Sequence, residues 1–297
     1  MYETNYTEEM SEKINRYLYL ILIDLIEKYN RGEYLSLFPI EGNVNFEGKI
    51  PVWVCWWQGI NNAPELVEKC VESIYRHIPE DIAKIHFITF ENYMNYVAFS
   101  ETIVNRFNKG LITLTHLSDI LRVQLLYRYG GLWLDATYFI SDDRIKDVFS
   151  KEFYTIKYSK PSWPGDVIAK GKWMVNFLFS KKNNPLFGFV MEAFEQYWSI
   201  RDDLLDYFLT DRLINVAYEN VEKIRNIIDL NPVNNLSSLK LMDCACSPYD
   251  EDIWNDMKKD TFAFKMSYKE YVASVTPDGE DTFYGKIINS HAHTETG

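Results

Sequence analysis

Three charged residues within one short stretch of the chain have the types and spacing needed to hold a polar ligand. Asp119 and Arg122 lie three residues apart in a mainly apolar segment, and Asp135 follows a second apolar run. Residues three apart lie on the same face of a helix. Charges on an otherwise apolar helix must be paired with each other or with a ligand, because an isolated buried charge is costly. The simpler interpretation is an ordinary ion pair followed by an acid that starts a loop.

A helix, a glycine turn and a short strand are the elements that must position these residues. Apolar residues recur at helical spacing before the turn: Leu117, Ile120, Leu121, Leu125 and Leu126. Gly130-Gly131 predicts the end of the helix, because glycine adopts left-handed backbone conformations without steric penalty. Leu132–Leu134 predicts a buried strand that ends at Asp135. In open α/β sheets, ligands bind beyond the carboxyl ends of strands.

The stretch SDILRVQLLYRYGGLWLDAT resembles the core motif of the capsular-polysaccharide-synthesis and mannosyltransferase-like glycosyltransferases. It is also similar to the catalytic core of the large bacterial glucosylating toxins. Those proteins share a Ser-Asp-x-x-Arg helix, a Gly-Gly turn and an aromatic-x-Asp-x-Asp strand end. The quoted residues match closely and the flanking chain loosely. One departure is Thr137, which stands where the family has its second Asp. Capsular-synthesis members often read Asp-Ala-Thr at this point.

The resemblance implies an α/β fold of the GT-A type, Rossmann-like and specific for nucleotide-diphospho-sugars, with added N- and C-terminal helical parts. It implies that Asp119 and Arg122 hold the hydroxyls of the donor sugar. Asp135 would contact the ribose and a metal ion, and Trp133 would pack near the donor. Thr137 can offer only a neutral oxygen or a water-mediated contact. Hard oxygen ligands imply Mn²⁺ or Mg²⁺ as the cofactor.

Further site residues follow from the same resemblance. Trp57 matches a tryptophan that stacks on the uracil ring, with Gln58 beside it, and Ser118 joins the donor site. Asn176 would reach the sugar or the acceptor, and Asp211 is a catalytic candidate. The simpler interpretations are that Trp57, like Trp53 and Trp56, fills the core, that Asn176 is a plain strand residue, and that Asp211 faces solvent on a helix over Asp206–Ile214.

His291 and His293 stand two residues apart near the C-terminus, so an extended chain would place both imidazoles on one face. Several transferases of the GT-A fold that the resemblance implies complete their metal sphere from the C-terminal tail. His291 is therefore a second candidate metal ligand, beside Asp135. A mobile terminus is the simpler interpretation.

Length and composition indicate a globular chain with one main domain and additions. The 297 residues are 47% hydrophobic and 16% aromatic. The net charge of −12, without a long basic run, argues against nucleic acid as a partner. The cysteines lack the spacing of a zinc site. The polar, acidic start and the short apolar run Tyr17–Ile26 predict no signal peptide or membrane span. We therefore expect a cytoplasmic protein and leave open a peripheral association with the inner face of the plasma membrane.

The rest of the pattern predicts three parts: an N-terminal helical extension over 1–47, a nucleotide-sugar-binding catalytic domain over 48–240, and a C-terminal part over 241–297 that completes the active site. One amphipathic helix is expected over 7–30. Strands over Ile50–Gln58 and Ile85–Phe90 flank a helix over Glu65–His77, which is the pattern of a βαβ unit and a parallel sheet. Further strands are expected over Lys109–Leu114 and Ile227–Pro232.

These features together predict a glycosyltransferase that moves a sugar from a UDP-sugar to an oligosaccharide or lipid-linked glycan in bacterial surface polysaccharide synthesis. Retention of the anomeric configuration is implied by the family and not by spacing. Two alternatives stay open. The chain could be a non-catalytic module that binds a nucleotide-sugar or glycan, which the missing second Asp favours, or a glycosyltransferase that modifies a protein.

Overall fold

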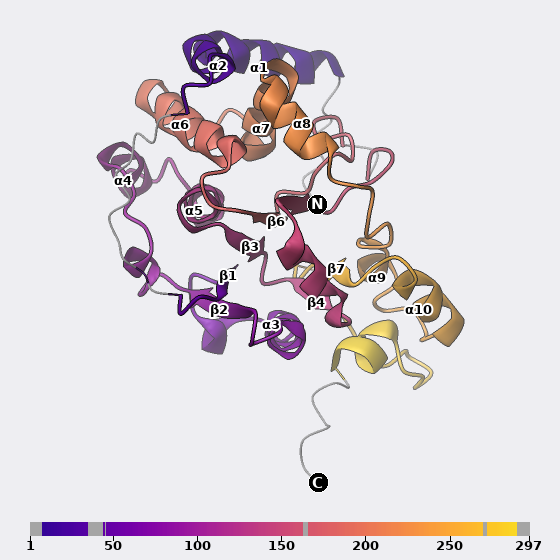
Figure 1. Ribbon diagram of the computed structural model, residues 1–297. Coiled ribbons are helices and arrows are strands. Elements are labelled where there is room, and N and C mark those ends of the chain that lie inside the picture. The colour runs from indigo at the N-terminus through magenta and orange to yellow at the C-terminus, as the bar shows by residue number, and fades with distance from the viewer. Residues whose placement is uncertain (1–7, 35–43, 45, 163–165, 270–271, 290–297) are drawn as a thin grey trace.

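The computed structural model describes residues 8–34, 44, 46–162, 166–269 and 272–289. A five-stranded sheet lies at its centre, in the order β2-β1-β3-β6-β5 (Figure 1). Its strands are β1 (Ile50–Cys55), β2 (Ala83–Ile88), β3 (Gly131–Leu134), β5 (Phe153–Thr155) and β6 (Phe177–Ser180). β1 runs parallel to β2 and β3, whereas β6 runs antiparallel to β3 and β5. The predicted α/β class is confirmed, with a mixed rather than a wholly parallel sheet.

Helices surround this sheet. They are α1 (Glu8–Ile21), α2 (Ile23–Asn30), α3 (Glu65–His77), α4 (Glu101–Asn108), α5 (Leu114–Tyr129), α6 (Pro185–Ile200), α7 (Leu209–Asn220), α8 (Glu222–Asp229), α9 (Lys240–Asp243) and α10 (Glu251–Lys258). Short 3₁₀ segments cover Ile60–Asn62, Tyr93–Asn95 and Asp143–Ser150, and a π-helical turn covers Tyr284–Asn289. The predicted strand–helix–strand start is confirmed by β1, α3 and β2.

Alternating residues on the strands direct the two faces of the sheet into different cores. Trp53 on β1 and Trp133 on β3 pack with α5 and α6 on one face. Val52 and Leu132, their neighbours in the chain, pack with α3 on the other face. This is the period-two pattern of a sheet that is buried on both sides. Helices α6 and α7 lie side by side, and α1 and α2 form a further layer over them (Figure 1).

Three predicted elements differ from the structure. The single helix over 7–30 is two helices, because the backbone departs from helical geometry at buried Leu22. Lys109–Leu114 is not a strand: Gly110 has φ of 72° after α4, and the Thr113 side chain caps α5 by accepting from the His116 amide. Ile227–Pro232 begins as the end of α8, because Ile224 and Ile228 bury the same helix face.

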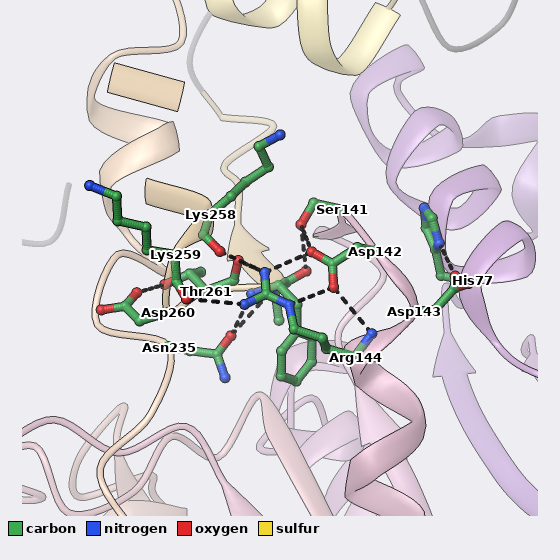
Figure 2. A network of polar contacts seen from close by, with 12 residues as sticks. His77, Ser141, Asp142, Asp143, Arg144, Asn235, Lys258, Lys259, Asp260 and Thr261 are labelled. Atoms are coloured by element: carbon green, nitrogen blue, oxygen red, sulfur yellow. Dashed lines mark hydrogen bonds and ion pairs between the residues drawn. The ribbon is translucent and has the colours of Figure 1, made fainter. Parts of the chain in front are cut away.

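The C-terminal part joins the central domain through a second sheet, in which β4 (Tyr138–Ile140) pairs with β7 (Ala263–Lys265). Arg144 fixes the approach to β7, since its guanidinium donates to the backbone oxygens of Lys258 and Thr261 at 2.7 and 2.8 Å (Figure 2). Asp142 accepts two further bonds from the same guanidinium. The predicted boundaries of the three parts stay predictions. Within the described ranges, no helix has both the length and the apolar character that a membrane span requires.

Candidate functional site

The turn between α5 and β3 brings the charged residues together. Gly130 and Gly131 have φ of 69° and 93°, values that favour glycine. A Cβ at Gly130 would lie 2.6 Å from the Lys182 nitrogen, and one at Gly131 would overlap the Pro51 carbonyl on β1. Only glycine therefore allows the helix to reverse into the strand at this point, as the sequence predicts.

Arg122 links the helix acid to the strand-end acid. Its Nη2 lies 3.0 Å from Asp119 Oδ1 and 3.5 Å from Asp135 Oδ1, and its Nη1 donates to the Val175 carbonyl at 2.8 Å. The guanidinium also lies over the Trp133 ring, 5.1 Å from its centroid, and the Trp133 indole donates to Asp135 at 3.1 Å. The guanidinium is buried, whereas the Asp119 and Asp135 side chains are 14% and 29% exposed. Both acids thus keep oxygen surface for a ligand.

A histidine supports Asp119 from behind. Trp198 Nε1, which can only donate, lies 3.1 Å from Nε2 of buried His116. His116 Nε2 must therefore accept, and in neutral imidazole the proton then lies on Nδ1, 3.5 Å from Asp119 Oδ2. Trp198 thus holds the His116 ring directly behind Asp119. Sequence reasoning missed His116, although it lies one helical turn before Asp119.

Beside these acids lies a cavity of about 280 Å³, here called the acidic cavity. Its polar lining includes Asp119, Arg122, Asp135, Asp166, Asn176, Thr210, Asp211 and Lys265. The Trp173 indole donates to Asp211 Oδ1 at 3.0 Å. Burial raises the pKa of Asp211 to about 7, and the nearby Asp119 charge adds to this rise. Asp211 therefore faces a cavity and not bulk solvent, contrary to the simpler expectation.

A second cavity, of about 480 Å³, lies on the other side of Arg122 and is here called the aromatic cavity. Its lining includes Cys55, Trp56, Trp57, Gln58, Ser118, Arg122, Trp133, Asp135, Thr137, Tyr207, Lys265, Met266, Tyr268 and Lys269. Trp57 is 7% exposed, and its indole donates to Ser118 Oγ at 2.6 Å and the Leu114 carbonyl at 3.0 Å. Trp56 is less buried and meets Tyr268 edge to face. Trp53 fills the core as expected, but Trp56 forms part of the cavity wall.

The two cavities meet at five residues that line both of them: Thr115, Arg122, Asp135, Tyr207 and Lys265. Each predicted site residue within the described ranges lines at least one of the two cavities. Trp57, Gln58, Ser118, Trp133 and Thr137 lie on the aromatic side, and Asp119, Asn176 and Asp211 on the acidic side. Asn176 is held by the Tyr138 hydroxyl, which donates to its Oδ1 at 2.8 Å. Their roles in binding or catalysis stay predictions.

The side chains at the predicted metal position fit a protein-built metal sphere poorly. In the part of the chain that the structure describes, no three His, Cys, Asp or Glu side chains gather as a metal-binding group. Thr137 Oγ1 instead accepts a hydrogen bond from Lys265 Nζ at 2.5 Å. His291 lies outside the described residues. The Mn²⁺ or Mg²⁺ cofactor stays a prediction.

Comparisons with known proteins point to glycosyl transfer. The chain is similar to the O-glycosyltransferase braB of Annulohypoxylon truncatum, at 24% identity over 158 residues, which are 50% of this chain and 37% of the relative. It is also similar to the glycosyltransferase afumC of Aspergillus fumigatus (strain CBS 144.89 / FGSC A1163 / CEA10), at 31% identity over 92 residues, 29% of this chain and 24% of the relative. The chain thus spans less than half the length of these curated relatives.

The chain is also similar to a solved structure of the WbbM bifunctional glycosyltransferase in its apo form. The match covers 88% of this chain and 51% of the WbbM chain, with 11% identity and a TM-score of 0.42. Both curated relatives are fungal and give no support to the predicted bacterial setting. A family model described as capsular polysaccharide synthesis protein matches residues 3–287, a range that includes α5, the glycine turn and β3. The chain therefore belongs to the capsular polysaccharide synthesis protein family.

Proposed function

We propose that this chain is a glycosyltransferase that moves a sugar from a UDP-sugar to a glycan acceptor. One observation carries the proposal: Arg122 and Asp135 lie where an aromatic cavity meets an acidic cavity. Aromatic rings suit a nucleobase, and carboxylates suit sugar hydroxyls, which donate hydrogen bonds to them. A UDP-sugar carries both groups, joined by a diphosphate.

In this reaction the bond between the anomeric carbon and the diphosphate oxygen breaks, and that carbon bonds to an acceptor oxygen. Negative charge grows on the departing UDP, and the acceptor hydroxyl loses a proton. Arg122, held between Asp119 and Asp135, places a fixed positive charge beside the breaking bond. Asp119 orients the hydroxyls of the sugar, and His116 keeps Asp119 in position.

We propose retention of the anomeric configuration, which the family resemblance implies. In a retaining transfer the departing phosphate takes the acceptor proton, and Asp211 orients the acceptor hydroxyl. Proton NMR of the first product identifies its anomer. An inverted product would make Asp211 the base instead, a role for which a pKa of about 7 is suitable.

The proposed setting is the synthesis of a bacterial surface polysaccharide at the cytoplasmic face of the plasma membrane, with an oligosaccharide or lipid-linked glycan as acceptor. Family membership supports this setting. Release of UDP from a panel of UDP-sugars, with and without oligosaccharide acceptors, tests the activity. Turnover of at least one donor is expected, and no turnover of any nucleotide-sugar would contradict the proposal.

A non-catalytic binding module is the second candidate, because Thr137 replaces the second acid of the family motif. Calorimetry with UDP and UDP-sugars separates the two functions. Tight binding of a UDP-sugar that is never cleaved, with or without acceptor, would favour the module.

A further inference from the structure

Lys265 is a charged residue on an otherwise apolar strand, and it lies where the two cavities meet. In β7 it is flanked by buried Phe264 and Met266, and its backbone pairs with Tyr138 of β4. Its side chain lines both the acidic and the aromatic cavity. A lysine is rarely retained in such surroundings unless its charge has a partner or a task.

The contacts of Lys265 fix its ammonium group beside the motif. Nζ donates to Thr137 Oγ1 at 2.5 Å and to the Met266 carbonyl at 3.1 Å. An ammonium has three N–H donors, so within the described ranges these contacts use two of them. Burial lowers the pKa of Lys265, and the charge of Asp135 opposes this shift. The ammonium thus lies against Thr137, the residue that stands where the family motif has its second acid.

The charges around the two cavities indicate which ligand group belongs near Lys265. The aromatic cavity is lined by Arg122, Lys265 and Lys269 against one carboxylate, that of Asp135. The acidic cavity instead has an excess of carboxylates. A diphosphate is therefore favoured on the aromatic side and at the junction, since a cation stabilises it there.

The backbone that carries Lys265 is held firmly in place. Arg144 ties residues 258–261, just before β7, to the 3₁₀ segment that follows β4 (Figure 2). The Lys265 amide also donates to the Ser238 carbonyl at 2.8 Å. A charge on so fixed a strand needs little reorganisation to meet a ligand, which is a requirement for efficient electrostatic stabilisation.

We propose that Lys265 is a built-in cation for the diphosphate of the donor, held beside Thr137, which replaces the second acid of the family motif. The inference rests on the proposed function and adds a residue to it. Lys265 binds the phosphate oxygens of UDP and stabilises the charge that develops on them as the sugar leaves. UDP binding then depends on Lys265 and does not require a divalent ion.

Binding of UDP and of uridine to the full chain tests this proposal, because uridine lacks the diphosphate. Calorimetry with UDP is carried out in EDTA and in Mn²⁺, and ligand-observed NMR follows uridine. Wild-type protein should bind UDP in EDTA. Lys265→Met should weaken UDP binding by about tenfold or more, the effect of losing a hydrogen bond to a charged group, and leave uridine binding within about twofold. Lys265→Arg should keep most of the UDP affinity.

Lys259→Met, an exposed lysine of the same C-terminal part, is the matched control and should not change UDP binding. If Lys265→Met melts at a markedly lower temperature, Lys265→Gln keeps a polar side chain of similar length and should show the same selective loss. The double variant Thr137→Asp/Lys265→Met should recover UDP affinity in Mn²⁺ but not in EDTA.

Three results would overturn the proposal: unchanged UDP affinity in Lys265→Met, an equal loss for UDP and uridine, or wild-type binding of UDP only in Mn²⁺. A wild-type protein that binds neither UDP nor uridine in either buffer would instead contradict the proposed function itself.

Discussion

Two of the buried arginine–aspartate pairs in this protein have the same chemistry and different surroundings. Arg212 Nε donates to Asp206 Oδ2 at 2.7 Å, and both side chains are 0% exposed. The same guanidinium donates to Ser11 and Asn15 of α1, so the pair ties α7 to the N-terminal helices. Arg122 and Asp119 approach each other to 3.0 Å, and the carboxylate of Asp119 lines a cavity.

The difference shows that pairing alone does not identify a functional charge. Asp206 Oδ1 accepts from the Phe208 amide and Oδ2 from Arg212, so the sealed pair has its oxygens occupied by protein. Asp119 and Asp135 share one guanidinium and remain partly exposed. The Arg212–Asp206 pair is completed by the protein, whereas the pair proposed to bind the donor is left incomplete beside a cavity.

Removing the cation of the sealed pair should have the largest effect, and it should act on stability. Arg212→Met leaves the Asp206 charge buried without compensation, which typically costs about 3–5 kcal/mol of unfolding free energy. Urea denaturation measures the loss. Lys13→Met, in an exposed pair on α1, should change it by less than about 0.5 kcal/mol. A loss in Arg212→Met no larger than in this control would contradict the structural role.

The acids around Arg122, which line a cavity, should affect activity rather than stability. Asp119→Asn and Asp135→Asn should each lower turnover of the UDP-sugar by about 10²–10³-fold, as removal of a preorganised electrostatic group does, with little change in melting temperature. UDP release and thermal melting are the measurements. Asp143→Asn, whose side chain is 77% exposed, serves as the control. Activity retained in both site variants would show that these assignments are wrong.

Asp211 should give the acidic cavity a dependence on pH. Its folded pKa is about 7 against an ordinary 3.8, so the native state holds a proton that the unfolded state has released. Stability relative to Asp211→Asn should therefore fall as pH rises from about 4 to about 7. Activity should rise as the pH passes about 7, because the Asp211 carboxylate forms there. Asp211→Asn should abolish that rise. Melting curves and pH–rate profiles that match in both proteins would contradict this.

The smallest effect is expected behind Asp119. Trp198→Phe removes the donor to His116 Nε2, so the imidazole is no longer held in one tautomer. The loss of one hydrogen bond, about 1 kcal/mol, should raise KM for the donor by about fivefold. Nitrogen chemical shifts of His116 should change with it. An unchanged tautomer would show that Trp198 only fills space there.

The local part of this architecture could be predicted from sequence. Apolar spacing, the glycine pair and a strand-ending acid specify α5, the turn and β3, because each signal acts over a few residues. The family resemblance was confirmed over nearly the whole chain. Within the described ranges, the site residues predicted from it line two cavities that share part of their walls.

The long-range part could not be predicted. Lys265 meets Thr137 across 128 positions of sequence, and no local pattern encodes such a contact. A lone lysine in an apolar strand was the available signal. Likewise, the break at Leu22 and the helical start of Ile227–Pro232 are set by packing against neighbouring helices, which overrides local preference.

The glycine turn has a consequence for how such proteins can diversify. Because it joins α5 directly to β3, the acids proposed to hold the donor all lie within residues 119–135, whereas Trp173 and Asp211 reach the acidic cavity from later segments. Mutations in those later segments can reshape the wall proposed to face the acceptor while the inherited turn keeps the acids in register. New recipients for the same activated sugar are then accessible through changes at that wall alone.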